Sequence, residues 1–175
     1  MKRISLFAVC LLATYLTYAQ TSDRVTKNHS INFPMGIGYA FEQPISKRTV
    51  LNVEVMLGGA FTSNSRTGTS WYLTPIFRLE PRHYYNYFRR QEKGKSTVNN
   101  SASYVSISVS YQSPLSIGND IEPIQAVSIV PKWGVKIPMG EKFTFNIAGG
   151  IGILKQQNSE FSETYEIDLN FGFNF

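Results

Sequence analysis

The last eleven residues, 165–175, alternate strictly between apolar or aromatic side chains at odd positions and charged, amide or glycine residues at even positions. Because successive side chains of a β-strand point to opposite faces, this period of two predicts a strand with one apolar and one polar face. The same alternation, again with the apolar residues at odd positions, recurs in six earlier segments: 31–41, 51–61, 71–79, 105–111, 127–137 and 143–153.

A transmembrane barrel fits these strands better than a soluble sandwich. Sandwich strands are usually shorter, whereas these segments match the ~9–11 residues with which a tilted strand crosses a membrane. Their polar faces are rich in Gly, Ser, Ala and Asn, which suit a narrow lumen. After residue 19 no apolar run approaches the length of a membrane helix. We therefore predict an all-β fold, an antiparallel up-and-down transmembrane β-barrel, with a soluble exported sandwich as an alternative.

The number of strands is expected to be eight, because such barrels normally have an even number. The best candidate for the eighth strand is the polar and weakly alternating segment 21–28. Four prolines lie inside or beside the alternating segments, and each removes a donor from the hydrogen-bond ladder. We expect bulges or strand ends at Pro34, Pro75, Pro131 and Pro138.

The lengths of the connections predict how the strands are oriented. Short turns face the periplasm and long loops face outwards in outer-membrane barrels. We assume that the last strand runs towards the periplasm and assign the earlier strands alternating directions. Five connections then fall on the side of the membrane that matches their length. These are the short turns 42–48 and 138–142, and the longer polar loops 62–70, 113–121 and 155–162.

One connection breaks this rule, since residues 83–100 would be periplasmic and yet are long. Its first part predicts a short helix that ends at Gly94. The segment also carries an aromatic cluster and a basic tract, Arg89–Lys95. Such a tract is usually a solvated turn. Our hypothesis is that it contacts peptidoglycan or a periplasmic partner.

Residues 1–19 have the features of a secretory signal peptide, with a basic start, an apolar core and a small residue, Ala19, before the cleavage point. The domain that remains is 20–175. Cys10 is the only cysteine and lies inside the leader, so no disulfide is expected. Removing Lys2 and Arg3 leaves 15 of the 17 basic residues against 12 acidic ones, a net charge of +3. This mild excess and the export signal argue against nucleic acid as a partner.

If the even positions line a lumen, they place four acidic and four basic side chains inside it. These are Glu54, Arg78, Glu80, Arg82, Lys132, Lys136, Glu166 and Asp168. Unpaired charges in a narrow lumen cost on the order of several kcal/mol each. We therefore expect a balanced charge network that fills the lumen. The alternative is a selectivity path, which would make the protein a narrow pore for ions or small solutes.

Catalysis requires a nucleophile, a base and an orienting group in one place. His29 and Ser30 are adjacent, so in a strand their side chains point to opposite faces. His83 follows Arg82 on the predicted periplasmic side. No metal-ligand spacing and no phosphate-binding loop is present. We expect no enzymatic activity, no metal and no cofactor; a lipid-modifying outer-membrane enzyme remains an alternative.

Several motifs together resemble small outer-membrane β-barrel proteins of the Bacteroidetes type. They are the leader ending at Ala19, the run from Leu79 to Tyr104, the motif Pro131–Gly134 and the aromatic closing strand. The resemblance implies an outer-membrane location after cleavage near Ala19, contact with outer-membrane lipid and, for most members, no described function. We expect a monomeric, non-enzymatic envelope protein with a structural or interaction role.

The closing strand also resembles the signal that the barrel assembly machinery recognises at the C-terminus of outer-membrane barrels. The residues that carry this likeness are Leu169, Phe171, Phe173 and the terminal Phe175. The assembly machinery is therefore an expected partner.

Overall fold

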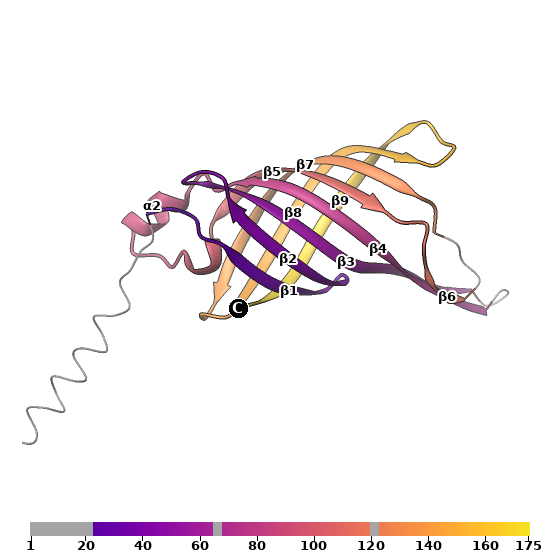
Figure 1. The fold of residues 1–175 in the computed structure, drawn as a ribbon, viewed down its shortest axis with the longest axis horizontal. Coiled ribbons are helices and arrows are strands. Elements are labelled where there is room, and N and C mark those ends of the chain that lie inside the picture. Colours follow the sequence, from indigo (N-terminus) through magenta and orange to yellow (C-terminus); the bar gives the residue numbers. More distant parts are fainter. Residues whose placement is uncertain (1–22, 65–67, 120–122) are drawn as a thin grey trace, which may run out of the picture.

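The computed structural model describes residues 23–64, 68–119 and 123–175, so the predicted signal peptide lies outside the described residues. One antiparallel sheet dominates the fold (Figure 1). Its strands are β1 (Asn28–Pro34), β2 (Ile37–Pro44), β3 (Thr49–Asn64), β4 (Gly68–His83), β5 (Ser103–Gln112), β6 (Ile117–Asn119), β7 (Ala126–Met139), β8 (Phe143–Gln156) and β9 (Phe161–Asn174).

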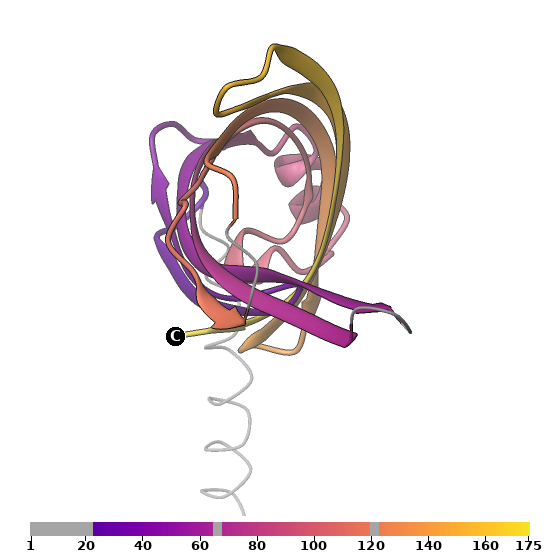
Figure 2. The same ribbon diagram turned by 90° about the vertical axis from the view of Figure 1, so that its right-hand side faces the viewer.

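The sheet closes on itself because β9 pairs with β1, with Phe173 opposite Ile31. β5 and β6 both pair with the same side of β4 and count as one interrupted strand of the barrel. The prediction of an eight-stranded antiparallel barrel is thus confirmed. Seen from one end, the strands form a closed ring (Figure 2).

The alternation in the sequence corresponds to the two faces of the wall. Odd positions point outwards, and their large apolar side chains are exposed, as in Phe77 (47%) and Ile107 (52%). Even positions point inwards and are buried, as in Glu54 (2%) and Ser108 (0%). The interior of this barrel is therefore polar and its exterior apolar, the reverse of an ordinary soluble domain.

The eighth strand does not come from 21–28. Residues 23–27 form no strand, and 21–22 lie outside the described residues. The segment 31–41, expected as one strand, instead turns back at Met35–Gly36 to form the β1–β2 hairpin. Gly36 has φ of 150°, and a Cβ there would lie 2.9 Å from the carbonyl oxygen of Leu57, so the turn favours glycine.

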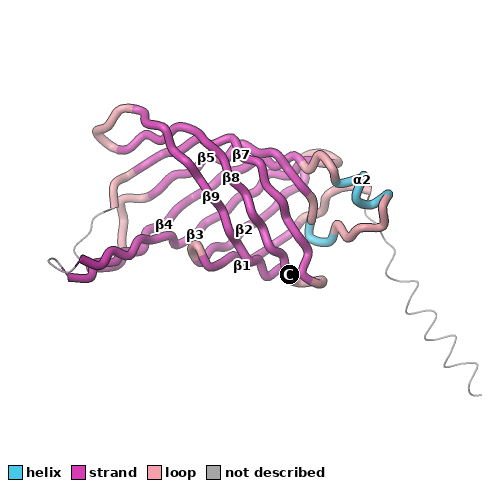
Figure 3. The backbone as a smooth tube through the Cα atoms, turned by 180° about the vertical axis from the view of Figure 1, so that it is seen from behind, coloured by secondary structure: helices cyan, strands magenta, loops and turns pink. Residues whose placement is uncertain are grey.

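The two ends of the barrel differ. The cap end holds the first described residues, the turns after β2 and β7, and the segment 84–102 between β4 and β5 (Figure 3). The opposite, loop end holds the β1–β2 turn and the connections after β3, β6 and β8. The predicted turns and the predicted loops therefore lie at opposite ends of the barrel, as expected. The loops are shorter than expected, because β3 extends to Asn64 and β4 begins at Gly68, β6 occupies Ile117–Asn119, and only 157–160 separate β8 from β9.

The wall of the barrel is lower where the short strands β1 and β2 form it, and this place is called the low wall. β1 and β2 have 7 and 8 residues, whereas β3 and β4 have 16 each. β1 reaches only residues 170–174 of β9, and β2 reaches only as far as Leu57 of β3. Within the described residues, the loop-end parts of β9 (161–169) and β3 (58–64) consequently have no strand between them.

Two of the four prolines lie at strand ends, as expected, and the other two lie inside continuous strands. Pro34 ends β1, and Pro138 is the last residue but one of β7. Pro75 lies inside β4, opposite the break between β5 and β6. Pro131 is different: β7 continues through it without a bulge, and only the pairing with β8 is missing at 130–131.

The segment 84–102 folds into a cap with a short helix, α2 (Tyr87–Glu92), and a 3-10 turn, η1 (Val98–Asn100). The predicted helix is therefore present, and it ends before Gly94, whose φ of 64° suits glycine. Tyr84, Tyr87 and Val25 are buried together in the small apolar core under this cap. Among the described residues, no helix has the length and apolar character needed to cross a membrane.

Candidate functional site

The lumen contains two groups of paired charges. The group nearer the loop end, called the upper cluster, consists of Glu54, Arg78, Lys132, Glu166 and Asp168. Arg78 Nη1 lies 3.3 Å from both Glu54 Oε2 and Asp168 Oδ1. Lys132 Nζ lies 2.6 Å from Glu166 Oε2 and 2.7 Å from Asp168 Oδ2. Asp168 thus joins the two cations into one chain of ion pairs across β3, β4, β7 and β9.

The group nearer the cap end, called the lower cluster, consists of Glu42, Glu80, Arg82 and Lys136. Arg82 Nη2 lies 2.6 Å from Glu80 Oε2, and its Nη1 lies 3.2 Å from Glu42 Oε1. Lys136 Nζ lies 3.0 Å from Glu42 Oε1 and 3.1 Å from Glu42 Oε2. All eight predicted lumen residues therefore form ion pairs in the barrel.

Glu42 is the lumen residue that the sequence analysis missed. It had been assigned to the turn 42–48, but β2 continues to Pro44 and Glu42 is paired with Asn28 of β1. Its even number is the signal that places it with the inward residues. With Glu42 included, the described part of the lumen holds five carboxylates and four cations, so the expected balance of four and four is wrong by one acid.

The lower half of the lumen is closely filled. The cavity between Glu42, Asn52, Arg82 and Lys136 has a volume of about 20 Å³, enough for one molecule the size of water. Within the described residues, the buried side-chain amide of Asn52 has no hydrogen-bond partner and faces this cavity. Tyr104 adds bulk, with its hydroxyl donating to Asn146 Oδ1 at 3.0 Å.

The cap closes this end of the lumen. Asn100 Nδ2 donates to Glu42 Oε2 at 2.8 Å, and the Tyr84 hydroxyl donates to Glu42 Oε1 at 3.1 Å. Asn100 also holds Thr26, accepting from its backbone N–H and donating to its carbonyl at 2.8 Å each. Burial, together with the neighbouring Glu42 carboxylate, raises the pKa of Tyr84 well above its ordinary value, so the phenol stays protonated and donates.

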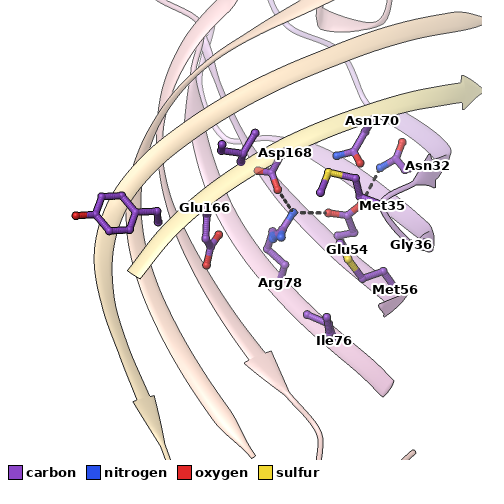
Figure 4. Close-up of a pocket in the computed structure, with 13 residues that line it drawn as sticks. Asn32, Met35, Gly36, Glu54, Met56, Ile76, Arg78, Glu166, Asp168 and Asn170 are labelled. Carbon is purple, nitrogen blue, oxygen red and sulfur yellow. Dashed lines mark hydrogen bonds and ion pairs between the residues drawn. The ribbon is translucent and has the colours of Figure 1, made fainter. Parts of the chain in front are cut away.

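The upper half of the lumen opens into a pocket of about 260 Å³, called the rim pocket. It lies where the wall is low, between β9 and the β1–β2 hairpin. Figure 4 shows Arg78 between Asp168 and Glu54, with Asn32 donating to Glu54 Oε1 at 2.8 Å. The pocket is lined by Asn32, Met35, Gly36, Gly38, Glu54, Met56, Ile76, Arg78, Tyr165, Glu166, Ile167, Asp168 and Asn170.

A second pocket, on the cap, is basic. It has a volume of about 380 Å³ and is lined by Tyr85, Asn86, Arg89, Arg90, Lys93 and Lys95. Arg90 Nη2 donates to the Ser96 carbonyl at 3.0 Å, which helps to shape this pocket. The structure therefore gathers the cations of the predicted tract Arg89–Lys95 around one hollow.

The histidines are not assembled into a catalytic group. His29 lies outside the barrel, where Nδ1 is 2.6 Å from the Tyr39 hydroxyl, while Ser30 is buried and donates to Asn32 in the lumen. His83 Nδ1 lies 3.0 Å from Thr49 Oγ1 at the cap end. In the part of the chain that the structure describes, no group of three or more His, Cys, Asp or Glu is placed to hold a metal ion.

The closing strand forms the seam of the barrel. Phe171 stacks on Phe33 of β1 at 6.0 Å between ring centroids, and the Phe175 N–H donates to the His29 carbonyl at 3.1 Å. Phe175 itself is 67% exposed, and Leu169 and Phe171 also face outwards. Three of the four predicted assembly residues are thus exposed on the outside, and Phe173 is half-buried between Phe143 and Phe175.

Comparison with known proteins adds no assignment. No protein-family model matches the chain, and neither a curated protein nor a solved structure matches it.

Proposed function

We propose that this protein is an integral outer-membrane β-barrel with a filled lumen, which serves the cell envelope as a structural or interaction protein without enzymatic activity. The observation that carries the proposal is the exposed apolar exterior around a buried charged interior. Soluble monomers rarely expose a contiguous apolar patch larger than a few hundred Å². An apolar exterior on every side of the barrel is therefore best explained by contact with lipid.

The height of this exterior supports the same proposal. From Phe175, which directly follows β9, back to Tyr165 the outward side chains are apolar or aromatic, and the next outward residue on β9 is Glu163. Ten residue steps at ~3.4 Å and a tilt of ~40° rise by about 26 Å, close to the ~25 Å apolar band of outer-membrane barrels. His29, Tyr39 and Phe41 cluster at the cap end, where an interfacial aromatic belt would lie.

The predicted leader and the closing strand support export and insertion by the barrel assembly machinery, with the cap end in the periplasm. We expect the protein to work as a monomer, because β9–β1 pairing closes the sheet within one chain. Purified protein that migrates as a stable oligomer in mild detergent would contradict this expectation.

The filled lower lumen argues against the alternative of a narrow pore. The ion pairs of Glu42 and the cap residue Asn100 occupy the path, and the cavity beside them holds about one water. We expect no steady conductance from purified protein in planar bilayers. The alternative of a lipid-modifying enzyme is tested by mass spectrometry of the outer-membrane lipids with and without expression, which should give identical spectra.

The basic pocket on the cap gives the interaction role its most specific candidate. Four cationic side chains around a hollow suit carboxylates, such as those of peptidoglycan stem peptides or an acidic periplasmic protein. Exposed cations bind by screened Coulomb attraction, so the interaction should weaken as ionic strength rises.

Outer-membrane fractionation with gel electrophoresis tests the proposal as a whole. Protein expressed with its leader should sediment with outer membranes, and unheated samples should migrate differently from boiled ones because the closed barrel resists the detergent. Recovery in the soluble periplasmic fraction, without heat-dependent migration, would contradict the proposed membrane location.

A further inference from the structure

The rim pocket opens through the wall of the barrel and not only through its mouth. It is lined by inward residues of β3 and β4, such as Met56 and Ile76, and also by Tyr165 and Ile167, which lie on the outer side of β9. The opening coincides with the low wall at the β1–β2 hairpin. The pocket therefore connects the upper cluster with the surface that the proposed function assigns to lipid.

The depth of the opening follows from strand lengths. The seven residues of β1 span six steps and rise by about 16 Å at ~3.4 Å per residue and a tilt of ~40°, whereas the apolar band is ~25 Å tall. The missing height lies at the loop end, at the depth of the outer leaflet. Unpaired strand edges are not tolerated against lipid unless they line a cavity or meet a polar partner, and the edge of β9 at 163–169 is such an edge.

The charges of the pocket indicate what it would accept. Three carboxylates, Glu54, Glu166 and Asp168, share only two cations in the upper cluster, which leaves one net negative charge. Both cations already contact two carboxylates each. The side chain of Glu166 is 19% exposed, which makes it the most exposed of the five side chains in the upper cluster. An added cation would therefore be attracted to this side of the pocket.

The remaining lining is apolar and flexible. Met35, Met56, Ile76 and Ile167 surround the acidic floor, and methionine adapts to irregular apolar ligands. The volume of about 260 Å³ lies just below the ~300–1,000 Å³ that is typical of small-molecule sites. This suits a small head group and part of one alkyl chain.

We propose, on the basis of the proposed membrane location, that the rim pocket binds a single-chain amphiphile with a primary ammonium head group. The ammonium, which has three donors and no acceptor, pairs with Glu166 and Asp168 and can donate to backbone carbonyl groups on the part of the β9 edge that β1 does not reach. The alkyl chain passes over Ile167 through the low wall into the outer leaflet.

Photo-crosslinking of the full barrel in lipid nanodiscs tests this site. The probe is a twelve-carbon primary amine with a diazirine on its chain, and crosslinked peptides are mapped by mass spectrometry. We expect saturable labelling of β3, β4 and β9 around Met56, Ile76 and Ile167. Excess dodecylamine should compete, whereas dodecyl sulfate and dodecanol should not. Equal competition by all three, or uniform labelling of every outward strand face, would overturn the proposal.

Two variants and a matched control sharpen the test. Met56→Trp fills the rim pocket and should abolish the saturable labelling. Met139→Trp lies on the outward face of β7 at the cap end, away from the pocket, and should leave the labelling unchanged. Glu166→Gln removes the excess negative charge and should weaken amine binding about tenfold, as expected for one lost charge-assisted hydrogen bond. Binding unchanged in both Met56→Trp and Glu166→Gln would refute the site.

Heat-dependent gel migration of each variant shows whether the barrel has folded, and flotation with liposomes tests the membrane location separately. A protein that floats but shows no saturable amine site would disprove this inference and leave the proposed function intact. Native mass spectrometry of protein extracted directly from outer membranes distinguishes the source of the ligand. A retained amine lipid indicates supply from the membrane, and an empty protein that binds added amine indicates supply from solution.

Discussion

Glu42 offers the sharpest test of the charged lumen, because one buried carboxylate holds both the lower cluster and the cap. Its side chain receives hydrogen bonds from Arg82, Lys136, Tyr84 and Asn100, at 2.8–3.2 Å. Glu42→Gln keeps the shape and removes the charge. Within the described residues Lys136 has no other carboxylate, so the change leaves a buried ammonium without a counter-charge.

The expected cost can be estimated from similar buried pairs. Removing one partner of a buried salt bridge destabilises a protein by about 3–5 kcal/mol. The other cation, Arg82, keeps Glu80 at 2.6 Å, so the loss should come mainly from Lys136. We expect the free energy of unfolding to fall by about 3 kcal/mol or more. Urea unfolding in phospholipid vesicles, followed by tryptophan fluorescence, measures this change.

A double variant separates the charge from the shape. Replacing Lys136 as well, in Glu42→Gln with Lys136→Met, removes the unpaired ammonium, and apolar replacements of buried pairs are often neutral. We expect the double variant to recover at least half of the loss. Glu141→Gln, in an exposed turn, is the control and should change the unfolding free energy by less than about 0.5 kcal/mol. A loss below about 1 kcal/mol for Glu42→Gln, or no recovery in the double variant, would refute the reasoning.

Three further predictions concern other parts of the barrel. Deleting Phe175 should lower the amount assembled in cells but leave refolding of purified protein into detergent nearly unchanged; equal losses in both measurements would show a purely structural role. Asn52→Leu should leave unfolding stability in urea unchanged or raise it by about 1 kcal/mol, because the buried amide has no partner among the described residues; a clear loss of stability would mean that a bound water satisfies it. Replacing Arg89, Lys93 and Lys95 by Gln should abolish salt-sensitive cosedimentation with peptidoglycan without altering heat-dependent gel migration, and unchanged cosedimentation would reject the cap as an interaction surface.

Much of the barrel could be predicted because odd and even positions report directly on the two faces of a strand. The eighth strand was missed for the same reason. Ile31 is opposite Tyr39 in the β1–β2 hairpin, so both strands keep their apolar residues at odd positions and the turn leaves the alternation in phase. Pro34, where a bulge or strand end was expected, and the pair Met35–Gly36, with a glycine in a conformation rare for other residues, mark the reversal.

The same limit applies to the charge network. The alternation predicts that each of these charged side chains points into the lumen. It does not predict which charges pair, because the pairing depends on the register between neighbouring strands. Glu166 and Asp168 were expected to neutralise one of the four lumen cations Arg78, Arg82, Lys132 and Lys136, without a choice among them. The structure pairs Glu166 with Lys132, and Asp168 with both Lys132 and Arg78. Glu42 was missed because it was assigned to the predicted turn 42–48, whereas β2 continues to Pro44. The rim pocket depends on unequal strand lengths, and those followed from the missed hairpin.

Neighbouring single-cysteine variants test the central claim, a lipid-facing exterior around a sealed polar lumen, most directly. The only cysteine lies in the predicted leader, so Ile107→Cys and Ser108→Cys each introduce one thiol on opposite faces of β5. In protein reconstituted into liposomes, a fluorophore at 107 should be quenched by lipid-borne quenchers. The thiol at 108 should resist both these quenchers and water-soluble maleimides. Rapid reaction of residue 107 with a water-soluble maleimide, together with no quenching from the lipid, would contradict the account.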